Sequence, residues 1–91
     1  MSDDRISSTT RALESAASSA GMWISGDGRV TEADAAALLG LAPGTLANLR
    51  GAEIAPTHYR TGRVTYRIAD LAHWIEAHRA VRIAASLERK P

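Results

Sequence analysis

The sequence has 91 residues, a mass of 9.7 kDa and a formal net charge of +1 at pH 7. A chain of this length forms one domain that buries only about 60% of its unfolded surface, so its margin of stability is small. Hydrophobic residues make up 45% but aromatic residues only 4%, which leaves little volume for an enclosed catalytic pocket. Because the sequence has no bilayer-length apolar window, no leader peptide and no cysteine, we expect a cytoplasmic protein without disulfides, thiolate metal sites or cofactors.

The charge is distributed unevenly along the chain. Residues 1–29 sum to −1, residues 30–56 to −2 and residues 57–91 to +4, and ten of the eleven cationic side chains are arginine. A guanidinium group carries five donors in a planar fork that suits phosphate groups and guanine edges. The charge polarity therefore favours a nucleic-acid partner, although a GC-rich genome would produce the same preference for arginine over lysine.

The first part of the chain is predicted to contribute little to the fold. Residues 1–21 are expected to form a polar tail, in which residues 10–20 can make a short helix that ends at Gly21. The apolar run at residues 22–24 is expected to be an extended segment that fills the core, with Trp23 as its anchor.

Two short helices are predicted next. Thr31 is placed to cap a helix over residues 32–39, and Gly40 is placed to end that helix. After a tight turn, Pro43 begins a second helix over residues 43–51. Two short helices joined in this way are typical of a helix-turn-helix unit.

The spacing then changes from helical to alternating. Residues 57–60 and 63–67 are predicted strands joined by a turn at Thr61 and Gly62. In the second strand Val64 and Tyr66 share one face, and the arginines at its two ends share the other. The sequence therefore predicts a small β-hairpin that carries positive charge.

The last predicted helix runs from residue 69 to about residue 87 and carries two apolar stripes. One stripe faces the core, and the other needs a second partner, which is either residues 22–24 or another copy of the chain. We expect a domain over residues 22–79 and a helical extension over residues 80–91 that supports weak self-association on DNA. The second stripe comprises Ala80, Ile83, Ala84 and Leu87. The predicted core anchors are Trp23, Leu38, Leu46, Leu71, Trp74 and Ile75.

The order of helix, tight turn, helix, arginine-bearing hairpin and helix resembles the winged helix-turn-helix domains of the MerR superfamily. The similarity is closest to the excisionase and AlpA-like branch. It is carried by VTEADAAALLGL at 30–41, TLANLR at 45–50, Pro56, TGRVTYRI at 61–68 and DLAHWI at 70–75. The resemblance implies a mainly α fold with a small β-hairpin wing. The sequence departs from the family pattern at residues 42–44, where the usual polar start of the second helix is missing, and at Leu49, where an aromatic residue is frequent.

The resemblance also implies which residues contact double-stranded DNA, because the second helix of such domains enters the major groove and the wing reaches phosphates or the minor groove. On this recognition helix the candidates are Pro43, Gly44, Thr45, Ala47, Asn48 and Arg50. On the wing they are Arg60, Thr61, Gly62, Arg63 and Arg67. Asn48 is the candidate for reading a base, since an amide can bridge N6 and N7 of adenine, and Thr31 is a helix cap or phosphate ligand.

Several of these residues have a structural alternative. Arg50 can form an ion pair with Glu53, and the hairpin arginines can protect an exposed sheet edge from pairing. The three histidines lack the spacing of a metal site, and no Ser–His–Asp arrangement indicates an enzyme.

By this resemblance the protein is a recombination directionality factor, or excisionase. Such a factor binds and bends attachment-site DNA and biases an integrase towards excision without catalysing a reaction. The alternatives are a stand-alone MerR-like transcriptional regulator and a protein-interaction module that uses the same fold without DNA.

Overall fold

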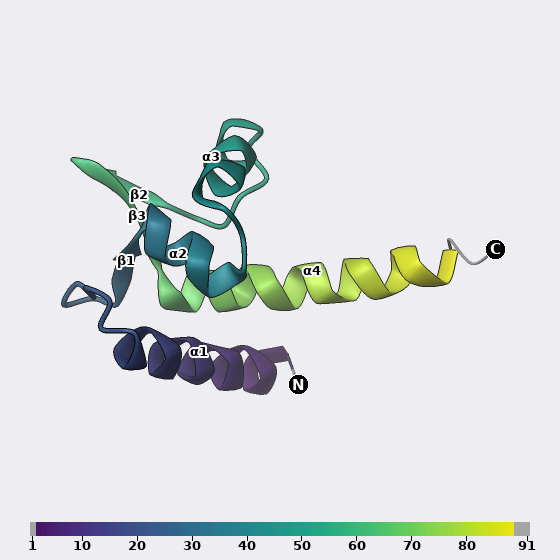
Figure 1. Ribbon diagram of the computed structural model, residues 1–91. Helices are drawn as coiled ribbons and strands as arrows, with labels where there is room; N and C mark the ends of the chain where they lie inside the picture. Colours follow the sequence, from purple (N-terminus) through teal and green to yellow (C-terminus); the bar gives the residue numbers. More distant parts are fainter. Residues whose placement is uncertain (1, 89–91) are drawn as a thin grey trace.

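The computed structural model describes residues 2–88, with the side chains of residues 4–60 and 62–78. The elements in chain order are α1 (Ser2–Ser19), β1 (Arg29–Thr31), α2 (Glu32–Leu39), α3 (Pro43–Gly51), β2 (Tyr59–Thr61), β3 (Arg63–Arg67) and α4 (Ile68–Glu88). Figure 1 shows α1 lying along α4, with α2, α3 and the β2–β3 hairpin beyond α4. The described chain is therefore mainly helical, with one small antiparallel sheet.

The N-terminal segment is helical from Ser2 to Ser19. The short helix expected over residues 10–20 is therefore present but begins earlier, and the expected tail is wrong for the residues before it that the structure describes. α1 packs along α4 and buries Leu13 and Ala17. Thr9 Oγ1 donates to Glu76 Oε2 of α4 at 2.7 Å. The sequence indicated only the second half of this helix, because the first half owes its stability to packing against α4 rather than to its own helix propensity.

The segment after α1 turns Trp23 towards solvent. α1 ends at Gly21 as predicted, with a φ of 69° that suits glycine. Met22 and Ile24 then pack against the core, whereas Trp23 is 55% exposed. Trp23 is therefore not a core anchor, and that prediction is wrong. Neighbouring side chains of an extended segment point to opposite sides, so burial of Met22 and Ile24 directs Trp23 outward.

The two predicted short helices, α2 and α3, are confirmed at the predicted bounds. Thr31 caps α2, because its Oγ1 accepts the Asp34 N–H at 3.2 Å, and Gly40 ends α2 with a φ of 76°. α3 begins at Pro43, and the preceding Ala42 makes no side-chain cap. The local cap and turn signals in this stretch therefore suffice to place both helices.

The sheet contains one more strand than predicted. The strand order is β1-β3-β2, and both pairings are antiparallel. Val30 of β1 lies opposite Tyr66, and Arg60 of β2 lies opposite Val64, so these four side chains point to the sheet face that covers the core. β1 was missed because a three-residue alternation is a weak signal and the strand depends on its pairing with β3.

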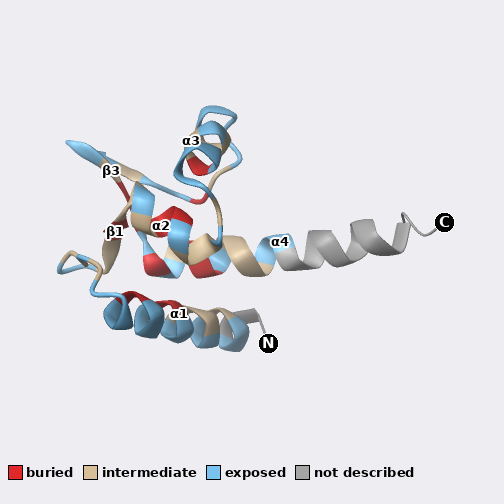
Figure 2. Cartoon of the chain, in the orientation of Figure 1, coloured by how far each residue is buried: buried red, intermediate tan, exposed pale blue. Residues whose placement is uncertain are grey.

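The core lies where α1, α2, the sheet and α4 meet, as the buried segments in Figure 2 show. Leu46 and Leu71 are fully buried as predicted, and Leu38 and Ile75 pack against the core while partly exposed. Tyr66 is the largest fully buried side chain, although the sequence placed it only on one face of a strand. The buried core residues are Leu13, Ala17, Val30, Ala35, Ala36, Leu46, Tyr66, Ile68, Leu71 and Ala72.

Trp74 was predicted to anchor the core, and that prediction is wrong. The side chain instead connects two segments. It is half-buried, and its indole Nε1–H donates to the carbonyl oxygen of Ile54 at 3.0 Å. Its ring lies 4.0 Å from that of His78, centroid to centroid. The indole needs a partner for its N–H, so it settles where α4 meets the segment that follows α3.

The predicted second apolar stripe, at residues 80, 83, 84 and 87, lies outside the described side chains. The helical backbone of α4 continues through these positions to Glu88. Within the part of the chain that the structure describes, no helix combines the length and apolar character needed to cross a membrane.

Candidate nucleic-acid interface

α3 is fixed to α2 by one leucine and one polar network. Leu46 is fully buried, and Arg50 in the last turn of α3 donates to both carboxylate oxygens of Glu32, from Nε at 2.7 Å and from Nη2 at 3.0 Å. Tyr66 Oη donates to Glu32 Oε2 at 2.8 Å. The network joins α2, α3 and β3, so it sets the position of α3 relative to the sheet.

The electrostatics of this network follow from its hydrogen bonds and burial. The bond from Arg50 is the main reason why the pKa of Glu32 is lowered, and the bond from Tyr66 adds to it. Burial, reinforced by the neighbouring carboxylate, raises the pKa of Tyr66 to about 12. Glu32 is therefore ionised and Tyr66 protonated near neutral pH.

Arg50 has a different partner from the one proposed as an alternative to DNA. Its ion pair is with Glu32, and the expected pair with Glu53 is wrong. Glu53 instead follows α3 in the left-handed region, with a φ of 64°, and its N–H donates to the carbonyl oxygen of Arg50 at 3.1 Å. The Arg50 side chain is only 21% exposed, so it contributes chiefly to positioning α3.

The side of α3 away from the core presents small and polar groups to solvent. Pro43, Gly44, Thr45 and Asn48 are exposed, and Ala47 is half-buried. The first turn carries no acidic residue, so the positive end of the helix dipole is not compensated there. The exposed surface of α3 therefore offers a hydroxyl, an amide and an electropositive helix end, which suit phosphate oxygens and base edges.

The β2–β3 hairpin places two arginines near its tip. Gly62 has a φ of 98° and connects Thr61 to Arg63, which are paired across the hairpin; the side chain of Thr61 is not described. Arg60 and Arg63 are both exposed, and the register puts them on opposite faces of the hairpin. In Figure 1 the tip and α3 both stand on the side of α2 away from α1.

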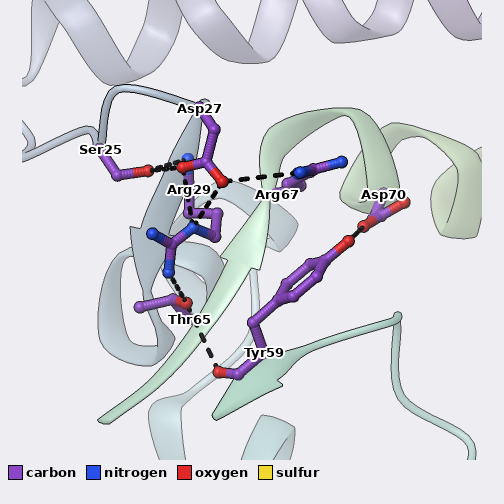
Figure 3. Close-up of polar contacts among 7 residues, drawn as sticks. All are labelled: Ser25, Asp27, Arg29, Tyr59, Thr65, Arg67 and Asp70. Carbon is purple, nitrogen blue, oxygen red and sulfur yellow. Dashed lines mark hydrogen bonds and ion pairs between the residues drawn. The ribbon is translucent and has the colours of Figure 1, made fainter. Parts of the chain in front are cut away.

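The outer face of the sheet carries a charged network centred on Asp27 (Figure 3). The Asp27 carboxylate accepts hydrogen bonds from Ser25 Oγ at 2.5 Å and from Arg29 Nε at 2.8 and 3.0 Å. Arg67 Nη2 lies 3.6 Å from the same carboxylate. The bonds from Ser25 and then Arg29 hold the pKa of Asp27 well below its usual range. This acid therefore stays ionised and orders two arginines.

The same network explains the positions of Thr65 and Arg67. Arg29 Nη1 donates to Thr65 Oγ1 at 2.9 Å, and Thr65 is only 3% exposed although it lies on the outer face. The Arg67 guanidinium lies 5.2 Å from the ring centroid of Tyr59, whose Oη lies 3.5 Å from Asp70 Oδ2. Arg67, predicted as a wing contact, thus belongs to a network at the base of the hairpin.

The structure brings together some of the predicted contacts and adds others. Thr45 and Asn48 share the exposed surface of α3, and Arg60 and Arg63 share the hairpin tip. Asp27 and Arg29 were not among the predicted functional residues. The alternation of Arg29 and Thr31 around the apolar Val30 was the available signal for an outer face of β1.

Comparisons with protein-family models, curated proteins and solved structures find no match. Among the residues that the structure describes, no group of histidine, aspartate or glutamate side chains is placed to hold a metal ion.

Proposed function

We propose that this chain is a small, non-enzymatic protein that binds double-stranded DNA sequence-specifically as a winged helix-turn-helix domain. α3 serves as the recognition helix and the β2–β3 hairpin as the wing. One observation carries the proposal: α3 is held from behind by Leu46 and Arg50, while Thr45 and Asn48 on its other side are exposed. A rigidly held helix with a free polar surface is what entry into a major groove requires.

The hairpin supports the same proposal through its charge. Arg63 and Arg60 lie near the hairpin tip. In Figure 1 this tip stands on the same side of α2 as α3. In this position a guanidinium reaches phosphates or a narrow minor groove next to the site of α3. The wing then contributes affinity for any sequence, and α3 contributes the preference for one sequence.

We propose further that the protein acts as a recombination directionality factor. The support is the resemblance to excisionases over residues 30–79. In this role the protein works in the cytoplasm, bends attachment-site DNA and biases an integrase towards excision. An excision assay with the integrase and the attachment sites of the same mobile element tests this role, and excision that is equally efficient without the protein overturns it.

The test of DNA binding compares Asn48→Ala with Arg63→Ala in gel-shift titrations over a salt series, using cognate and random duplexes. Asn48→Ala should cost about 1–3 kcal/mol on the cognate duplex alone and leave the salt slope unchanged. Arg63→Ala should weaken binding to every duplex and lower the salt slope by about one ion. Ser15→Ala, which changes an exposed polar residue of α1, is the matched control and should bind like the parent.

Both variants should melt close to the parent protein, because neither side chain is buried. If both fold normally and both bind cognate DNA as tightly as the parent, this surface does not contact DNA and the proposal fails.

A further inference from the structure

A hollow of about 360 Å³ opens on the outer face of the sheet and contains no residue of α3 in its lining. It is lined by Trp23, Arg29, Arg63 and Thr65, and we call it the Trp23 hollow. Its volume lies within the range of about 300–1,000 Å³ that is usual for small-ligand sites. The lining combines one large aromatic ring, two guanidinium groups and one nearly buried hydroxyl.

The indole of Trp23 is held in an exposed position. Trp23 is 55% exposed, whereas Met22 and Ile24 on either side of it pack against the core. Its backbone is therefore held on both sides, so the outward direction of the ring is built into the fold. A large aromatic side chain fixed in solvent is typical of a binding surface.

The floor and one wall of the hollow are held rigidly. Thr65 is 3% exposed and accepts a hydrogen bond from Arg29 Nη1, while Asp27 accepts two hydrogen bonds from Arg29 Nε. The guanidinium of Arg29 is thus already engaged by Asp27 and Thr65, whereas Arg63, which also lines the hollow, is exposed. The hollow therefore offers a preformed lower surface and one accessible guanidinium group.

We propose that the Trp23 hollow binds an unpaired nucleotide of a single-stranded nucleic acid, with the base stacked on the indole of Trp23 and the adjoining phosphate paired with Arg63. This site goes beyond the proposed duplex-binding function and uses residues other than those of α3. Aromatic stacking combined with a cationic group is the usual means of holding single strands, because every base has a π face.

The chemistry of the hollow favours this ligand over two others. In a duplex the bases are stacked on one another, so the flat face of Trp23 would meet only sugars and phosphates. An acidic peptide would satisfy Arg63 but would bring no flat apolar group to cover the indole. An unpaired nucleotide satisfies both side chains at once.

The experiment measures binding of the full chain to the oligonucleotide dT12 by the quenching of tryptophan fluorescence and by anisotropy of a labelled strand. Stacking of a base on Trp23 should quench the tryptophan fluorescence of the parent protein. Trp23→Ala should abolish the quench and weaken binding about tenfold or more, whereas Trp23→Phe should keep most of the affinity without the quench. Arg63→Ala should weaken binding and reduce its salt slope by about 0.7.

Two matched controls separate the site from general effects of charge and exposure. Ile54 is 57% exposed but does not line the hollow, so Ile54→Ala should bind dT12 like the parent. Arg60 shares the hairpin with Arg63 but points to the other sheet face, so Arg60→Ala should weaken binding by no more than about twofold.

Each outcome decides the inference. No binding of dT12, equal binding by Trp23→Ala, or an equal quench by a polyglutamate peptide overturns it. The proposed duplex function is tested separately by the binding of Asn48→Ala to cognate duplex. The same variant should bind dT12 like the parent. A protein that binds cognate duplex but not dT12 therefore refutes the Trp23 hollow alone, and one that binds only dT12 refutes the duplex function alone.

Discussion

The two faces of the sheet are built by the same three strands but carry opposite chemistry. The inner face buries Val30 and Tyr66 completely, whereas the outer face carries Arg29, Arg63 and Arg67. The difference arises from alternation along β1 and β3, which sends neighbouring side chains to opposite sides. A change of one residue position along a strand therefore separates a side chain that holds the fold from one that is free to bind.

This separation predicts which mutations should affect stability and which should affect ligand binding. Both faces contain arginine or tyrosine in hydrogen bonds, but the large side chains that are fully buried, Val30 and Tyr66, lie on the inner face. The ion pairs of the outer network join Asp27, which is largely exposed, to Arg29 and Arg67, and such pairs contribute little to the free energy of unfolding. We therefore expect stability to depend on the inner face and ligand binding on the outer face and α3.

The largest expected effect is the loss of stability when Tyr66 is truncated on the inner face. Truncation of Trp23 provides the comparison on the outer side. Tyr66→Ala should lower the free energy of unfolding by about 3–5 kcal/mol, because it empties the largest buried volume. Trp23→Ala should lower it by less than about 0.5 kcal/mol, since that ring is mostly exposed. Chemical denaturation of both variants checks the contrast, and similar losses would contradict the division between the faces.

A smaller effect should appear in how the free energy of unfolding depends on pH, through Glu32 of the inner network. The pKa of Glu32 is lowered in the folded protein from an ordinary value of 4.5, chiefly by the hydrogen bond from Arg50. Its stabilising contribution is therefore complete above pH 4.5 and is lost as the pH falls through the lower folded-state pKa. Urea midpoints measured from neutral to acidic pH should fall less steeply for Glu32→Gln than for the parent.

Asp27 provides the control for that measurement, because its pKa is also lowered but it lies on the exposed outer face. Asp27→Asn should remove its own part of the acid sensitivity and leave the part that belongs to Glu32. A parent-like slope in the Glu32→Gln variant would show that the inner network does not contribute to acid sensitivity.

A third change lies on neither face of the sheet. Glu53 ends α3 with a φ of 64°, which a residue with a side chain adopts only at a cost. Glu53→Gly should raise the free energy of unfolding by about 0.4–1 kcal/mol, because glycine fits this conformation without strain. Glu53→Ala removes the charge but keeps the strain, so it should show no such gain in thermal melts.

The smallest effect concerns charge on the outer face. Asp27→Asn leaves Arg29 and Arg67 without their shared carboxylate, so the outer face becomes more positive. Affinity for duplex DNA of any sequence should rise by a few-fold at low salt, and the excess should vanish as salt increases. Ser25→Ala keeps the carboxylate and should show no gain, and a gain that persists at high salt would contradict the electrostatic explanation.

Local signals predicted the middle of the chain well. The cap at Thr31, the glycine at position 40 and the proline at position 43 define α2 and α3 through interactions within a few residues. The hairpin and α4 were also expected from their own alternation and helical spacing. Such features can be read from sequence because their causes are local.

The missed features depend on contacts between distant segments. α1 requires α4, β1 requires β3, and the direction of Trp23 depends on which of its neighbours the core accepts. The pairing of Arg50 was wrong for the same reason, since Glu32 lies 18 residues away whereas Glu53 lies within reach along the helix end. Composition and spacing do not encode which of two possible partners is nearer in space.

The strand order has a consequence for synthesis on the ribosome. β3 lies between β1 and β2, and the largest core side chain, Tyr66, is supplied by β3. A nascent chain that has produced α1, β1, α2 and α3 therefore still lacks the strand that completes the sheet and the helix that covers α1. We therefore expect the fold to be completed only after residues 63–76 have been synthesised.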